Sequence, residues 1–151
     1  MNIIISIIRN YTLISAVSGW CAAQFAKVFT GMFRKEKFSI VRLLFSAGGM
    51  PSSHSAMISA LCTASGIEYG LNSFQFSVTF VLAMIVMRDA AGVRKEAGEQ
   101  AKAINQLRAK LFRWPVENDV LNELVGHTPL QVLAGAAVGA AAAYTLQIIF
   151  F

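Results

Sequence analysis

Ala47-Gly48-Gly49-Met50-Pro51-Ser52-Ser53-His54-Ser55-Ala56 joins a small, polar turn to the start of an apolar run. Its two glycines allow backbone conformations that other residues resist, and its proline ends any helix that arrives from upstream. Either of the serines after the proline can cap a new helix. His54 is one of only two histidines in the chain, so the stretch predicts a helix that begins beside a chemically active side chain.

The second histidine, His127, has a similar setting. It stands in Gly126-His127-Thr128-Pro129, directly ahead of another apolar run. Thr128 is a natural N-cap, and Pro129 suits the first position of a helix. Two histidines, each at the start of a hydrophobic helix, are the chemical signal of this sequence.

The composition is that of a membrane protein. Of the 151 residues, 56% are hydrophobic and 14% are charged, whereas about a quarter are charged in ordinary soluble domains. We therefore predict one all-α domain over residues 1–151, an integral membrane bundle of about four transmembrane helices and one cytoplasmic or interfacial helix. The expected spans lie near 10–33, 52–67, 72–89 and 129–150, and the interfacial helix near 90–112.

The basic residues predict the orientation in the membrane. Apart from Arg9 and Lys27, every Lys and Arg lies in one of two regions, 34–50 and 88–128. The positive-inside rule places these regions in the cytoplasm and both termini outside, in an inner or plasma membrane. Anionic headgroups explain the net charge of +5 more simply than nucleic acid does, so we expect no nucleic-acid partner.

The polar candidates converge on the cytoplasmic face in this topology: Lys27, His54, Asp89, Arg94 and His127. The set suits a phosphate group, because cations can hold its oxygens while one neutral histidine attacks phosphorus and the other, protonated, assists the leaving oxygen. A carboxylate normally orients the attacking imidazole, and Asp89 is the candidate. The alternative is that both histidines only cap helices or face water. No compact ligand spacing favours a metal, so we predict neither metal nor cofactor.

Three ordered blocks of sequence carry a family resemblance. Pro51-Ser52-Ser53-His54 resembles the Pro-Ser-Gly-His motif of type 2 phosphatidic acid phosphatases and vanadium haloperoxidases. Residues 48–55, 89–94 and 126–132 together are similar to the divergent branch of that superfamily, small membrane proteins related to acid phosphatase and vanadium-dependent haloperoxidase. The resemblance implies a membrane helical bundle that handles phosphate.

The resemblance also implies roles for individual residues. His54 would be the general acid and His127 the nucleophile that attacks phosphorus. Ser52 and Ser53 would bind phosphate together with backbone N–H groups.

Basic residues extend this proposed phosphate site. Lys27 and Arg34 have the Lys-to-Arg spacing of the family's first motif, although Lys35 replaces its proline. Arg94 is a further candidate for binding phosphate.

Three departures from the superfamily pattern bear on catalysis. Val120 and Leu121 stand where a Ser-Arg pair is usual, and Gln131 stands where an Asp follows the nucleophilic histidine. Gln131 can hold a tautomer by hydrogen bonding but cannot stabilise an imidazolium as a carboxylate does. Either Asp89 and Arg94 supply the missing groups, or the protein is not a conventional phosphatase.

The leading hypothesis is a membrane hydrolase that cleaves a lipid phosphate or pyrophosphate through a phosphohistidine. One alternative is a catalytically impaired membrane protein that binds phosphate or phospholipid, and another is a small transport or scaffold protein. The expected partners are a phosphorylated lipid and, because four short helices make a thin bundle, a second copy of the chain in a homodimer.

Overall fold

A computed structural model describes residues 3–33, 49–112, 120–123 and 125–150, and all of its regular elements are helices. In chain order these are α1 (Ile3–Ile8), α2 (Tyr11–Phe33), α4 (Ser53–Tyr69), α5 (Phe74–Ala91), α6 (Val93–Phe112) and α7 (Pro129–Phe150). The all-α prediction is therefore confirmed. Helices also lie over each predicted range, whereas the single-domain assignment stays a prediction.

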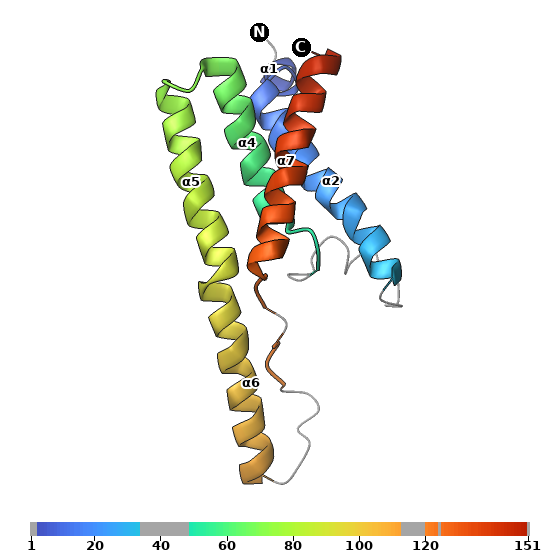
Figure 1. The fold of residues 1–151 in the computed structure, drawn as a ribbon, viewed down its shortest axis with the longest axis vertical. Coiled ribbons are helices and arrows are strands. Elements are labelled where there is room, and N and C mark those ends of the chain that lie inside the picture. The colour runs from blue at the N-terminus through green and yellow to red at the C-terminus, as the bar shows by residue number, and fades with distance from the viewer. Residues whose placement is uncertain (1–2, 34–48, 113–119, 124, 151) are drawn as a thin grey trace.

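Helix α4 is the centre of the bundle. It packs against α2, α7 and α5, and its buried face consists largely of small residues such as Ala56, Ala60 and Ala64 (Figure 1). Small residues let helix backbones approach closely. The close approach is most pronounced at Gly135 and Gly139 of α7, where an added Cβ would overlap the carbonyl oxygens of Ser52 and Ala56.

Serine caps set where two of the helices begin. The Oγ of Ser52 accepts a hydrogen bond from the backbone N–H of Ser55 (3.4 Å) at the start of α4. The Oγ of Ser73 accepts one from the N–H of Phe76 (3.1 Å) at the start of α5. Between these two helices, Gly70 adopts a φ of 82°, a left-handed conformation that favours glycine.

Two helical stretches are long and apolar enough to cross a membrane: Phe74–Leu111, which joins α5 to α6, and α7. The sequence predicts four spans, so the structure supports part of that prediction. Helix α4 has only 17 residues, about 26 Å of rise against about 30 Å of hydrocarbon. Helix α2 carries the buried polar residues Gln24 and Lys27. The assignment of α2 and α4 as spans remains a proposal.

Helix α6 continues nearly in line with α5 and extends beyond the other helices (Figure 1). Leu121 lies beside α6, because Asn105 Nδ2 donates to its carbonyl oxygen (2.9 Å) and its N–H donates to Asn105 Oδ1 (3.0 Å). His127 lies just before the first residue of α7, Pro129.

Candidate functional site

The N-terminus of α4 is joined to α7 beside it. The backbone N–H of Ser52 donates to the carbonyl oxygen of Gln131 (3.1 Å), and its Oγ accepts from the hydroxyl of Ser55 (3.0 Å). Ser52 and Ser55 are fully buried. The predicted cap is thus confirmed as Ser52, and it fixes where the first turn of α4 presents its N–H groups.

Lys27 reaches the same helix start from α2. Its side chain is only 8% exposed, and its Nζ donates to Ser53 Oγ (3.1 Å). No carboxylate forms an ion pair with it in the described part of the chain. A buried ammonium without a counter-ion is costly in free energy, so its place beside the positive end of a helix dipole favours a site that receives an anion.

His127 is buried, with 5% exposure, and it is held at two atoms. Its backbone N–H donates to the carbonyl oxygen of Ala90 at the end of α5 (2.9 Å), and its Nδ1 lies 3.3 Å from Gln131 Oε1. Because the N–H of Thr128 also donates to Gln131 Oε1 (2.9 Å), this oxygen is an acceptor. We assign the proton of a neutral His127 to Nδ1, which leaves Nε2 with its lone pair.

The surroundings of His127 keep its ring neutral. Burial is the largest cause that lowers its pKa below the ordinary value, while the hydrogen bond with Gln131 acts in the opposite direction. The positive charges of Lys27, His54 and Arg94 lower the pKa further. Contacts place these groups at one end of the bundle, since Lys27 donates to Ser53 beside His54 and Arg94 pairs with Asp89, the neighbour of the Ala90 that His127 contacts.

His54 is the second residue of α4 and, unlike His127, is exposed. Its accessibility suits a group that exchanges protons with water.

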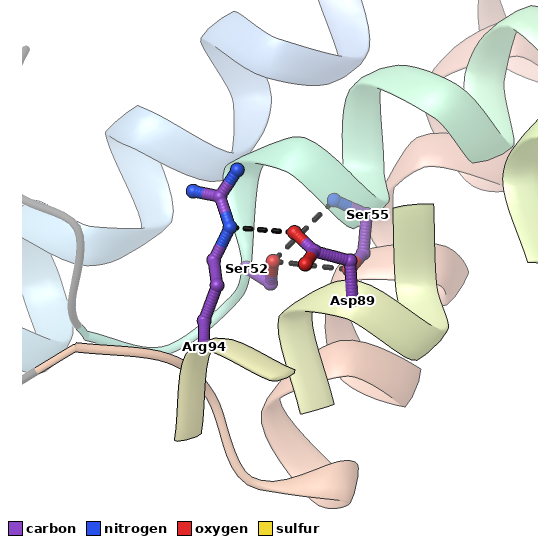
Figure 2. A network of polar contacts seen from close by, with 4 residues as sticks. All are labelled: Ser52, Ser55, Asp89 and Arg94. Atoms are coloured by element: carbon purple, nitrogen blue, oxygen red, sulfur yellow. Dashed lines mark hydrogen bonds and ion pairs between the residues drawn. The ribbon is translucent and has the colours of Figure 1, made fainter. Parts of the chain in front are cut away.

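Asp89 and Arg94 lie on either side of the break between α5 and α6. Arg94 Nε and Asp89 Oδ2 are 2.6 Å apart, and both side chains are partly exposed (Figure 2). The sequence hypothesis placed Asp89 against the nucleophilic histidine, but the structure gives the Nδ1 contact of His127 to Gln131. Asp89 instead orients Arg94.

The structure thus brings Lys27, Ser53, His54, Arg94 and His127 to one end of the bundle. Arg34, the remaining predicted phosphate ligand, lies outside the described residues. No group of three or more metal-binding side chains occurs in the described ranges.

One contact that shapes this region was not predicted, and a second follows from a role that the sequence analysis allowed. The hydroxyl of Thr30 donates to the carbonyl oxygen of Met50 (2.7 Å) and so holds the turn before α4 against α2. The sequence identified Gln131 as able to hold a histidine tautomer but not to replace a carboxylate, and its Oε1 does lie 3.3 Å from His127 Nδ1. Its position four residues after His127, one helical turn away, was the signal for a direct contact.

Comparisons with known proteins identify the family of the chain. The divergent PAP2 family (DUF212) matches residues 8–142 of the chain. The uncharacterized membrane protein YuiD of Bacillus subtilis (strain 168) is 40% identical over 147 residues, covering 88% of this chain and 91% of its own. No solved structure matches significantly.

Proposed function

Because the chain belongs to the divergent PAP2 family, we propose that it is an integral membrane phosphatase acting on a lipid phosphate or pyrophosphate. The observation that carries the proposal is that two buried side chains, His127 and Lys27, lie at the same end of the bundle, where Lys27 donates to Ser53 at the start of α4. A nucleophile and an anion-binding helix start then share one site, on the cytoplasmic face by the distribution of Lys and Arg.

The reaction proceeds in two steps. Nε2 of His127 attacks phosphorus, the bond between phosphorus and the lipid-side oxygen breaks, and protonated His54 gives its proton to that oxygen. Water then attacks the phosphohistidine, with His54 accepting a proton, and inorganic phosphate leaves. Lys27, Arg94 and the first turn of α4 stabilise the charge on the phosphoryl oxygens.

Purified protein tests this function directly. We expect it to release inorganic phosphate from phosphatidic acid or a polyprenyl pyrophosphate in the presence of a metal chelator, because side chains supply all the cations of the proposed site. The measurement is phosphate release in detergent or vesicles. Vanadate should inhibit by occupying the same site.

A second candidate is a membrane protein that binds phosphate without turnover. It is favoured by Gln131, because an amide cannot stabilise an imidazolium as a carboxylate does. Saturable vanadate binding without phosphate release from either lipid class would support this candidate and contradict the phosphatase.

Replacing Gln131 tests how it positions His127. The nucleophile must be neutral, so the rate should rise with pH through the pKa of His127, below about 6.5 in the native protein. In Gln131→Glu the new carboxylate stabilises the imidazolium. The acid limb of the pH profile, where the rate rises as His127 loses its proton, should therefore move to higher pH by about one unit. Gln131→Leu removes the acceptor and should lower kcat more than KM.

The pH profile of phosphate release in the two variants checks this expectation. Gln75→Glu, the same substitution at an exposed position on α5, should leave the profile unchanged. An acid limb that does not move in Gln131→Glu would show that Gln131 does not act on the titrating nucleophile.

A further inference from the structure

A cavity is lined by residues at the end of the bundle opposite the histidines, the end where Figure 1 shows α1 and the C-terminal part of α7. Its volume is about 340 Å³, and it is lined by Arg9, Tyr11, Ile67, Glu68 and Gln147. These residues come from the link between α1 and α2, the start of α2 and the C-terminal ends of α4 and α7. The volume lies within the range of about 300–1,000 Å³ usual for small-molecule sites.

The cavity carries opposite charges on its two sides. Arg9 precedes the N-terminus of α2, where the helix dipole is positive, and Glu68 lies in the last turn of α4, where it is negative. Among the described residues, Arg9 and Glu68 form no ion pair with each other within 4.0 Å. Both charged side chains line the one cavity.

The floor of the cavity is apolar and firmly held. Tyr11 is buried in a cluster with Ala60, Ala64 and Ala143, and Ile67 packs against the same cluster. The hydroxyl of Tyr11 donates to the carbonyl oxygen of Ala143 (3.0 Å), which ties α2 to α7 beneath the cavity. The cavity thus has a polar mouth and an apolar base.

We propose that this cavity binds a group that carries both a phosphate and a primary ammonium, the headgroup of an ethanolamine phospholipid. Arg9 and the Gln147 amide bind the phosphate, and Glu68 accepts hydrogen bonds from the ammonium. A quaternary ammonium has no N–H to donate, and an anionic headgroup without an ammonium leaves Glu68 unpaired. The proposal rests on the membrane location in the proposed function but not on catalysis.

Lipid retention measured by native mass spectrometry tests the site. The protein is equilibrated with mixed vesicles containing equal amounts of phosphatidylethanolamine, phosphatidylcholine and phosphatidylglycerol, then stripped with detergent. We expect about tenfold preferential retention of phosphatidylethanolamine, the effect of one or two charge-assisted hydrogen bonds. Arg9→Gln and Glu68→Gln should each remove the preference, whereas Arg9→Lys should keep part of it. Gln75→Ala, an exposed substitution on α5, is the control.

Equal retention of the three lipids, or an unchanged preference in both charge-removing variants, would overturn the proposal. A second experiment measures binding of free phosphoethanolamine. If its affinity equals that of the lipid and is lost in Glu68→Gln, the proposed chemistry of the cavity is supported, and the ligand is a soluble molecule. Thermal unfolding confirms that each variant is folded. Arg9→Gln and Glu68→Gln should retain phosphate release, because both residues lie at the end of the bundle opposite His127. Failure of the lipid-binding proposal can therefore be distinguished from failure of the phosphatase proposal.

Discussion

His127→Ala should reduce phosphate release by at least about a thousandfold, because it removes the atom that forms the covalent intermediate. The loss should appear in kcat. Binding of vanadate should weaken much less, since Lys27 and the start of α4 remain in place. The measurements are phosphate release at saturating lipid and displacement of bound vanadate.

Two comparisons make this result specific. His54→Ala should slow release by about 10²–10³-fold, the usual contribution of a general acid, and should affect a pyrophosphate less than a monoester because its leaving group needs less protonation. His127→Gln preserves size and polarity and should be as inactive as His127→Ala. Undiminished turnover in either His127 variant would contradict the assignment of the nucleophile.

Gly139→Leu should destabilise the fold and abolish activity together. A Cβ at Gly139 would overlap the carbonyl oxygen of Ala56, and its next contacts are also backbone atoms of Ala56. Backbone cannot move aside as a flexible side chain can, so α4 and α7 must separate. We expect a cost above about 3 kcal/mol, beyond the usual range for overpacking.

Separation of α4 from α7 would also disturb the candidate functional site. The N–H of Ser52 on the α4 side bonds the carbonyl oxygen of Gln131 in α7, so a wider gap displaces the two histidines relative to each other. Ala137→Leu is the matched control, since Ala137 is exposed on the same helix. Thermal unfolding in detergent and phosphate release should both be near normal in the control. Normal stability of Gly139→Leu would show that α4 and α7 do not pack through this glycine.

The sequence predicted the helices well because their signals are local. Apolar runs set the lengths of α5 and α7, and Ser52 and Pro129 mark helix starts by cap chemistry that depends on neighbouring residues alone. The direction of α6 was harder to predict. Its amphipathic pattern suggested an interfacial helix, whereas its near-continuity with α5 points it away from the bundle (Figure 1).

The site was predicted only in outline. Topology alone placed Lys27, His54 and His127 at one end, because helices that alternate in direction bring alternate ends together. Which side chains contact each other depends on how each helix is rotated and shifted along its axis, and the sequence pattern does not define either. Asp89 contacts Arg94 in the structure, whereas Gln131 makes the contact with His127 that its amide group allows.

The central claim is a covalent bond between phosphorus and His127. The most direct measurement is alkaline quenching of the protein during turnover of a ³²P-labelled lipid phosphate, followed by peptide mapping, because phosphohistidine survives alkali and is lost in acid. The account predicts label on the peptide containing His127, absent from His127→Ala and chased by unlabelled substrate. Steady phosphate release with no label on that peptide would contradict it.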